Sequence, residues 1–488
     1  MIPAPMPYDH FRDLVAALDG RGLLRHVQAE VDKDWELSTV ARQIFLNMPE
    51  HQRYALQFDH VKSFDMPVVV GAFGASREVY AFGLDAKPDD LLERWADALS
   101  SPIQPELVQE APCQEIVLTG KDVDLCQFPV PVWTPPVDPG PFFTATCVIT
   151  KDPQTGIRNI GTRRMQVKGP NRTGMNLTPK SHTEKHVLAN EAQGKNTPCA
   201  VAIGVEPAVG MLSAARIFYG LDEVAVAGGL KRAPVKLVKA KTMDFEVPAS
   251  AEIVLEGEIL AGVREPEGPF GEMSGHFVME KPAFVFQVNA ITMRRNALLQ
   301  AWVSQKPPSE STKLRGIGHE GMVYKYLTRD MALPGILDVH ITESSSSHGH
   351  LWVRGKWRSR EHAQNALTSA LTHSPRLGKI TAVFDDDIDV RDPFQVDWAL
   401  AFRAQPDRDF SFYPKLAEMH WDPSTAPDAS REGYGAGYQK ITGKLAIDAT
   451  KKWDYTPVSL PPEDMQRQVR DQWAKYGLPP LRDKPDVY

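Results

Sequence analysis

The middle of this chain carries many short strand patterns and few long helical ones. From about Ile116 to Ala301, short apolar runs alternate with polar residues at a period of two. In one of these runs, Ile253, Leu255 and Ile259 alternate with glutamates. Further candidate strands lie at 144–150, 157–165, 199–204 and 284–290. Many short strands in succession favour a barrel or a strongly bent sheet.

On both sides of this region, helix and strand patterns alternate. Three amphipathic helices are predicted before it, at 11–18, 37–45 and 91–99. After Lys306, helices and strands are again predicted in turn, at 323–331, 336–341, 361–371 and 380–384. Because such alternation is typical of α/β domains, we predict one α/β domain at each end of the strand-rich region.

A chain of 488 residues is too long for one ordinary hydrophobic core, so several domains are expected. We predict an N-terminal α/β domain at 1–112, a central strand-rich domain at 113–305 and a C-terminal α/β domain at 306–455. The tail at 456–488 contains a predicted helix with an apolar stripe, formed by Met465, Val469, Trp473 and Tyr476. Such a stripe needs a partner in the chain's own core or in a neighbouring subunit, and we assign it to a subunit interface.

Composition and charge exclude several classes of function. The chain is 42% apolar and 24% charged, which is typical of globular proteins. Its 55 basic and 62 acidic side chains leave a net charge of -7, which gives no general attraction to nucleic acid. The most apolar window, about 198–218, contains Glu206, Pro207 and Arg216 and cannot span a membrane. Since the N-terminus has no apolar signal segment, we expect a cytoplasmic protein without membrane or nucleic-acid partners.

Two carboxylates stand five residues apart, as Glu267 and Glu272 on either side of a Gly-Pro-Phe-Gly segment. Proline fixes φ and glycine permits positive φ, so this backbone can direct both acids toward one place. Paired carboxylates in different environments hold one proton donor and one charged orienting group at neutral pH. The segment also fits an acidic surface turn.

Several further polar residues lie on or near predicted strand ends before the acid pair. They are Asn159, Arg164, His182 and Glu223. An amide oxygen, an imidazole and a carboxylate can together hold Mn²⁺ or Mg²⁺, particularly an ion that bridges to a phosphate. Taken singly, each of these residues also fits an ordinary structural role. The four cysteines have no CxxC spacing and predict neither a zinc site nor a disulfide framework.

The segment from Gly316 to Gly321 matches the dinucleotide-binding pattern GxGxxG, and Asp338 lies at the distance expected of a ribose-binding acid. That motif requires a strand directly before it, whereas 309–315 is polar and predicts the start of a helix. We therefore do not predict a dinucleotide-binding domain. The pair His348 and His350 has metal-like spacing but no third ligand nearby, so we predict a loop there.

Six ordered stretches of the sequence, which together run through most of the chain, match one known family. They are Val123–Pro131, Ile149–Asn159, Arg164–Gln166, Glu267–Glu272, Phe384–Pro393 with Gln405–Arg408, and Ala446–Thr450. With these stretches the chain resembles the UbiD family of prenylated-flavin-dependent (de)carboxylases. The resemblance implies an N-terminal α/β domain, a central FMN-binding split β-barrel and a C-terminal α/β oligomerisation domain, which is a multidomain fold of the α/β and α+β classes.

The resemblance also assigns roles to individual residues. Arg164, Glu267 and Glu272 match the family's catalytic residues. The family's metal ligands, which tie Mn²⁺ (or Mg²⁺) to the flavin phosphate, match Asn159, His182 and Glu223.

Other positions match the family's cofactor site. Ser213 matches a position near a bound K⁺ ion. Lys379 aligns near the phosphate when the register of the match is shifted by about one residue. The full set of expected cofactor-binding residues is Thr162, Arg163, Arg164, Ser181, His182, Ser213, Glu223 and Lys379.

The implied activity is reversible, non-oxidative decarboxylation of an aromatic or α,β-unsaturated carboxylic acid. Loss of CO₂ from an aromatic carbon leaves an electron pair that the ring cannot delocalise, and no side chain is an adequate electron sink. The resemblance implies that prenylated FMN, made by a flavin prenyltransferase, supplies the sink through a covalent adduct. Arg164 would hold the substrate carboxylate and Glu267 would fix the guanidinium plane. Glu272 would deliver the proton, with a pKa raised by burial above its reference of about 4.3.

The substrate pocket is expected to include Met273, Lys313 and Ile317. In one interpretation, a cation near Lys313 recognises a second feature of the substrate, such as a hydroxyl, a second carboxylate or a coenzyme A thioester. In the other, Lys313 belongs to an ordinary solvated helix face together with Arg315, Lys325 and Arg329. Two other functions stay open, namely an FMN-binding redox protein and a subunit of a larger aryl carboxylase. We expect a homodimer or a homohexamer.

Overall fold

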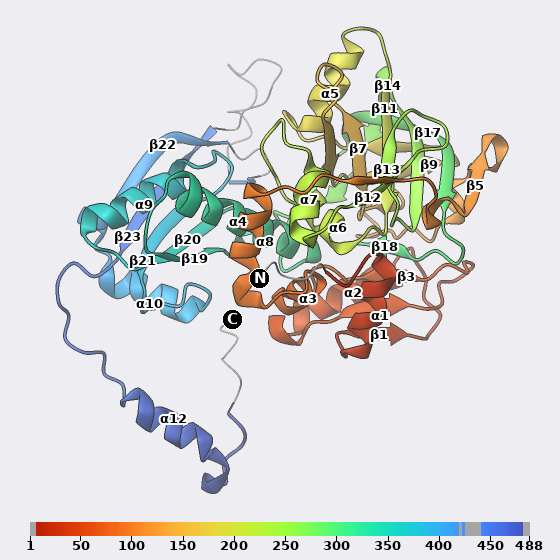
Figure 1. Ribbon diagram of the computed structural model, residues 1–488. Helices are drawn as coiled ribbons and strands as arrows, with labels where there is room; N and C mark the ends of the chain where they lie inside the picture. The colour runs from red at the N-terminus through yellow and green to blue at the C-terminus, as the bar shows by residue number, and fades with distance from the viewer. Residues whose placement is uncertain (1–5, 419–421, 425–440, 482–488) are drawn as a thin grey trace.

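The computed structural model describes residues 6–418, 422–424 and 441–481. Figure 1 shows an N-terminal part that packs against a central sheet, and a C-terminal part whose own sheet lies to one side. Helices α4 (Leu91–Ser100) and α8 (Glu310–Lys325) lie between the two sides and pack against each other. Among the described helices, none combines the length and the apolar character that crossing a membrane requires.

The central sheet is built from the strand patterns of the sequence. Within the described residues its strands lie in the order β6-β9-β10-β17-β14-β11-β7-β8, and β5 also pairs with β17. The two long strands, β14 (Ile253–Glu267) and β17 (Lys281–Met293), pair antiparallel with two shifts of register. Such shifts bend the strands, as a strongly bent sheet requires. The shorter strands are β5 (Ile116–Thr119), β6 (Phe142–Phe143), β7 (Cys147–Lys151), β8 (Arg158–Gly161), β9 (Met165–Gly169), β10 (Arg172–Met175) and β11 (Thr197–Ile203).

One expected strand of this sheet is interrupted. The pattern from Ile157 to Met165 predicted a single strand, but β8 ends at Gly161 and β9 starts at Met165. The break lets Arg164 leave the ladder and face the interior. Three short helices follow along the chain, α5 (His182–Glu191), α6 (Pro207–Ala214) and α7 (Glu223–Lys231), and each begins or ends beside the same interior space.

The N-terminal part and the central part share structure. Strands β1 (Leu24–Val27), β2 (Ala55–Phe58) and β3 (Val68–Val70) form a sheet with β18 (Leu299–Ala301), which comes from the end of the central region. A second small sheet joins β4 (Glu106–Val108) to β12 (Lys236–Lys239) and β13 (Glu246–Pro248). The helices α1 (Phe11–Gly20), α2 (Glu36–Asn47) and α3 (Arg77–Gly83) complete the N-terminal part.

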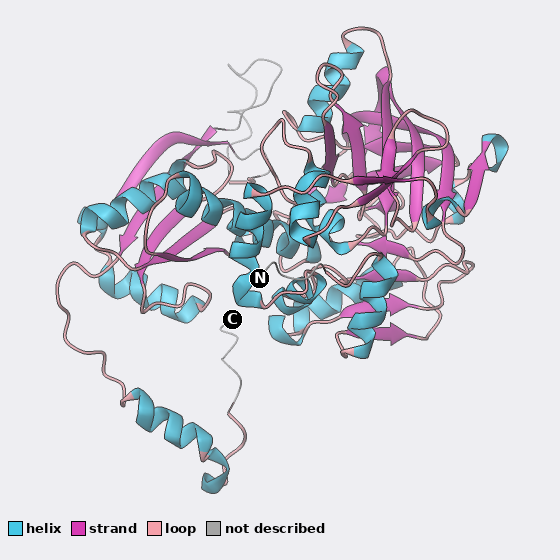
Figure 2. Cartoon of the chain, viewed as in Figure 1, coloured by secondary structure: helices cyan, strands magenta, loops and turns pink. Residues whose placement is uncertain are grey.

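The C-terminal part is a five-stranded sheet with helices, as the alternating patterns predicted (Figure 2). Its strand order in the described residues is β19-β20-β21-β23-β22. The strands are β19 (Ile336–Ile341), β20 (His350–Gly355), β21 (Ile380–Asp385), β22 (Phe410–Glu418) and β23 (Ile441–Ala449). Helices α9 (Arg360–Thr372), α10 (Pro393–Arg403) and α11 (Pro406–Asp409) connect them.

Helix α12 (Glu463–Asp471) stands away from the rest of the molecule (Figure 1). Its apolar residues Met465 and Val469 are 57% and 40% exposed. The part of the chain that the structure describes therefore leaves the predicted stripe exposed.

The GxGxxG segment lies wholly inside α8, so it is not the strand–turn–helix of a dinucleotide site. Its glycines serve close packing. A Cβ added at Gly321 would lie 2.2 Å from the Cβ of Trp95, and one added at Gly318 would lie 2.9 Å from the Cβ of Ala215. The motif is thus a set of helix-packing positions.

Candidate active site

A cavity of about 520 Å³ opens between the central sheet, α6 and α8. Its wall contains residues from the break between β8 and β9, from the start of α5 and from the loop after β14. The predicted site residues that line it are Asn159, Thr162, Arg163, Arg164, Ser181, His182, Ser213, Glu223, Glu272 and Met273. The fold therefore gathers into one cavity side chains that are more than 100 positions apart in the sequence.

Arg164 is held between the two acids of the sequence motif. Its Nε and Nη2 donate to Oε1 and Oε2 of Glu267, at 2.9 and 3.1 Å. Its Nη1 donates to Oε1 of Glu272 at 2.5 Å. Burial alone would lower the pKa of Arg164, but the two carboxylates outweigh it and raise the pKa above the ordinary value.

The two acids have different surroundings. Glu267 is fully buried behind Arg164, whereas the side chain of Glu272 is 24% exposed and lies on the cavity wall. Glu267 ends β14, and the following Gly268 has a φ of +96°, a conformation that glycine adopts without strain. A short hairpin, β15 (Phe270–Gly271) with β16 (Phe277–Val278), then brings Glu272 back to the guanidinium.

The predicted metal ligands also come together. His182 is the first residue of α5 and Glu223 the first of α7, and their Nδ1 and Oε1 atoms lie 3.3 Å apart. The amide of Asn159 on β8 donates to Oγ1 of Thr183, next to His182. In the described part of the chain, no three His, Cys, Asp or Glu side chains form a metal-binding group, so the set depends on the amide of Asn159.

The predicted cofactor-binding residues line the same wall. Thr162 Oγ1 lies 2.7 Å from Ser213 Oγ, and the backbone N–H of Thr162 donates to the carbonyl of Ser213. The guanidinium of Arg163 donates to Thr183 Oγ1 at 3.4 Å. Burial, together with nearby Arg315, lowers the pKa of Arg163 to about 10. The Oγ of Ser181 caps α5.

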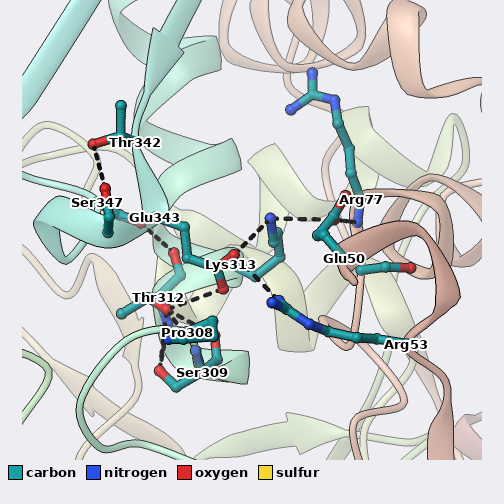
Figure 3. A network of polar contacts seen from close by, with 12 residues as sticks. Glu50, Arg53, Arg77, Pro308, Ser309, Thr312, Lys313, Thr342, Glu343 and Ser347 are labelled. Carbon is teal, nitrogen blue, oxygen red and sulfur yellow. Dashed lines mark hydrogen bonds and ion pairs between the residues drawn. The ribbon is translucent and has the colours of Figure 1, made fainter. Parts of the chain in front are cut away.

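Four predicted residues lie outside the cavity wall, namely Glu267, which is buried behind Arg164, and the three described next. Lys379 donates to Oδ2 of Asp422 at 2.7 Å and to Oγ of Ser424 at 2.8 Å. Ile317 is buried in the hydrophobic core, at 2% exposure. Lys313 lies between Glu50 and Glu343, with 3.1 Å from its Nζ to each carboxylate (Figure 3). The interpretation of Lys313 as part of a solvated helix face is wrong, because its side chain is only 14% exposed.

The sequence did not single out two histidines on the cavity wall as site residues. On α8, Ser311, Arg315 and His319 line the cavity, and their spacing of four residues puts them on one helix face. His348, which was assigned to a loop, packs its ring against His319 with the centroids 4.7 Å apart. Burial lowers the pKa of His319 to about 4. The i, i+4 spacing from Arg315 was the one signal that could have identified His319.

Family models match nearly the whole chain. They describe three parts of a 3-octaprenyl-4-hydroxybenzoate carboxy-lyase, namely its N-terminal domain at 15–99, its Rift-related domain at 106–307 and its C-terminal domain at 313–449. The chain belongs to the UbiD family. Its fold class is the one that the sequence predicted.

Three similar proteins match this chain over more than nine-tenths of its length. An uncharacterised protein of Archaeoglobus fulgidus is 32% identical over 471 residues, which cover 92% of this chain and 93% of that protein. An evolved dimeric form of the UbiD-class enzyme HmfF from Pelotomaculum thermopropionicum, in complex with prFMN, is 32% identical with a TM-score of 0.82, covering 94% of this chain and 98% of its own. The apo 3,4-dihydroxybenzoic acid decarboxylase of Enterobacter cloacae is 27% identical with a TM-score of 0.81, covering 96% and 100%. This UbiD-family chain thus has the fold of decarboxylases, including one named for an aromatic acid.

Proposed function

We propose that this protein catalyses the reversible, non-oxidative decarboxylation of an aromatic or α,β-unsaturated carboxylic acid with prenylated FMN. The observation that carries the proposal is the position of Arg164, which two carboxylates hold at the wall of a ligand-sized cavity. The similar HmfF structure in complex with prFMN supports this choice of cofactor.

The residues present fit such a cofactor. The cavity volume of about 520 Å³ is within the range of small-molecule and cofactor sites. Asn159, His182 and Glu223 supply an oxygen and nitrogen donor set that suits Mn²⁺ or Mg²⁺ next to a phosphate. Ser213 would lie near a K⁺ ion, and Arg163 adds a buried cation for the phosphate side. When bound, prenylated FMN supplies the electron sink that the side chains lack.

Within this site the chain's own residues bind the acid and move the proton. The guanidinium of Arg164 binds the substrate carboxylate, because its planar donors match a carboxylate edge. Glu267 keeps that guanidinium charged and oriented through its two hydrogen bonds. Glu272 is the proton donor, since it reaches both the cavity and Arg164, and it protonates the carbon that loses CO₂.

Arg315 is the residue that suits recognition of a second polar or anionic feature of the substrate. Its Nη1 contacts the sulfur of Met273 at 3.0 Å, and in the described residues no carboxylate lies within ion-pair distance. Lys313 cannot take this role, because Glu50 and Glu343 already hold its ammonium outside the cavity wall. A partly buried guanidinium beside the catalytic acid favours a substrate with a hydroxyl or a second carboxylate.

Co-expression with a flavin prenyltransferase tests the proposal. We expect the purified protein to show an altered flavin spectrum and to release CO₂ from at least one acid in a panel of aryl and acrylic acids. Glu272→Gln should keep the cofactor and lose turnover. Arg315→Gln should raise KM for acids with a second anionic group more than for acids without one.

Binding of unmodified FMN with electron transfer and no CO₂ release would instead favour the redox protein. Turnover only after addition of further subunits would favour the multi-subunit carboxylase.

A further inference from the structure

Lys313 lies where three parts of the chain meet (Figure 3). It is on α8, Glu50 is in the N-terminal part, and Glu343 follows the first strand of the C-terminal sheet. The ammonium of Lys313 is 3.1 Å from each carboxylate, and Arg53 Nη1 adds a contact of 3.3 Å to Glu343. One largely buried cation therefore ties the N-terminal part and the C-terminal part to the same helix.

Glu343 belongs to a loop that reaches the cavity. We name residues 342–348 the serine loop. Ser346 Oγ donates to the backbone carbonyl of Met273 at 2.5 Å, directly after the catalytic acid Glu272. His348 ends the loop and lines the cavity. The same short loop thus carries a partner of Lys313 at one end and cavity-wall contacts at the other.

The backbone of the serine loop is strained and needs outside support. Ser346 and Ser347 have φ of +60° and +57°, in the left-handed region that non-glycine residues disfavour. Ser347 Oγ donates to the carbonyl of Thr312 at 2.6 Å, one residue before Lys313. A Cβ at Gly316 would lie 2.8 Å from Ser347 Oγ, so the loop lies very close to α8. Such a conformation persists only while contacts on both sides hold it.

The charges of the cluster depend on one another. Burial alone would raise the pKa of Glu50, but Lys313 and the backbone N–H of Arg77 outweigh it and lower the pKa to about 2. Burial would likewise lower the pKa of Lys313, but Glu343 and Glu50 raise it. Removing the ammonium would leave two ionised carboxylates without their shared cation, and Glu343 would lose its link to Glu50.

We propose that Lys313 is a positioning residue, which holds the serine loop against α8 through Glu343 and so fixes Met273 and His348 at the cavity wall. The expected effect of Lys313 on turnover rests on the proposed function, because the loop supports the residue next to the proton donor. The effect of Lys313 on the loop itself can be measured without any substrate.

The test compares Lys313→Met, Glu343→Gln and Lys313→Arg in the full-length holoprotein by hydrogen–deuterium exchange of peptides that cover 342–348 and 272–276. We expect the first two variants to exchange about tenfold faster in both segments, and Lys313→Arg to restore slow exchange. In Lys313→Met and Glu343→Gln, kcat for an acid that the wild-type protein turns over should fall about tenfold, while the flavin spectrum stays unchanged. If Lys313→Met does not fold, Glu343→Gln still tests the inference, because it breaks the same ion pair from the other side.

Lys325→Met is the matched control, because Lys325 is on the same helix and, among the residues that the structure describes, forms an ion pair with Asp330 alone. Unchanged exchange at 342–348 in both Lys313→Met and Glu343→Gln would overturn the inference. Equal acceleration in Lys325→Met would also overturn it, since the effect would then come from general loss of helix stability. If the wild type decarboxylates nothing, the proposed function fails while the exchange data still decide the role of Lys313.

Discussion

Arg164 uses one edge of its guanidinium for Glu267 and leaves Nη1 for Glu272. The buried acid thus fixes the orientation of the guanidinium, and the cavity-facing acid contacts the donor that a substrate carboxylate would approach. On the proposed function, the contact between Arg164 and Glu272 is exchanged for a contact with substrate.

Replacing the guanidinium by an ammonium should damage the site strongly. Lysine at position 164 can supply one point charge but not two parallel donors to Glu267. We expect kcat/KM of the holoenzyme to fall about 100-fold or more in Arg164→Lys. Arg172→Lys is the control, because Arg172 is nearby on β10 and forms an exposed pair with Glu265. Equal kinetics in the two variants would contradict the role of Arg164.

The two acids should respond differently to amide replacement. Glu267→Gln removes the fully buried charged partner of Arg164 and leaves only the partly exposed Glu272, so the free energy of unfolding should fall by about 3–5 kcal/mol. Glu272→Gln should change stability much less, because Glu272 is partly exposed and makes one contact with Arg164. Denaturant titration of both variants measures the difference. A larger loss in Glu272→Gln would contradict the assignment of Glu267 as the structural anchor.

Asp138 predicts a pH dependence of stability. Its Oδ2 accepts hydrogen bonds from the backbone N–H groups of Trp133 and Thr134, while Oδ1 is buried without a partner in the described structure. Burial raises the pKa of Asp138 to about 6. Since the folded-state pKa lies above the unfolded one, the stabilising effect is complete below about pH 4 and is lost as pH rises through 6.

Asp138→Asn should therefore gain up to about 3 kcal/mol of unfolding free energy relative to wild type between pH 4 and pH 8. Urea titrations of both proteins across that range provide the measurement. A difference that does not change with pH would show that Asp138 keeps an ordinary pKa in the folded protein.

Gly321→Ala tests the packing role of the GxGxxG segment. The added methyl group would meet the Cβ of Trp95, so we expect a loss of about 1–3 kcal/mol in unfolding free energy. The control is Gly140→Ala, because a Cβ at Gly140 would meet open space and its φ is not positive. Gly262 and Gly477 also have open space, but their positive φ would make alanine strained there. Gly140→Ala should leave the midpoint of thermal unfolding unchanged.

The exposed tail helix predicts assembly. We propose that α12 packs its apolar stripe on a second copy of the chain, within a homodimer or homohexamer. Deleting 456–488 should lower the molar mass measured by light scattering, and Met465→Lys with Val469→Lys should do the same. Gln466→Lys, next to the stripe, is the control. A wild-type monomer would contradict the proposal.

The sequence predicted the parts of the site that lie close together along the chain, and family resemblance supplied the rest. The Gly-Pro-Phe-Gly segment indicated that Glu267 and Glu272 converge, because its backbone preferences are local. The pairing of Arg164 with Glu267 spans 103 positions and depends on the register of β14 with its neighbours, which periodicity does not determine. Residue types made Asn159, His182 and Glu223 candidate metal ligands and the resemblance assigned them that role, and the fold brings them into one cavity.

Predictions near α8 were less accurate because they depend on how a helix is rotated. Lys313 and Ile317 lie on one face of α8, outside the cavity wall, whereas Arg315 and His319 lie on the opposite face and line the cavity. A rotation of about 100° per residue separates these positions, and sequence alone did not determine which face meets the site. His348 comes from a loop whose position depends on its contacts with α8.

The unequal burial of the two acids has an isotopic consequence. Glu267 is fully buried, whereas the side chain of Glu272 is partly exposed to solvent. If Glu272 is the proton donor, its proton exchanges with bulk water between turnovers. Decarboxylation in D₂O should then leave one deuterium on the product, at the carbon that carried the carboxylate.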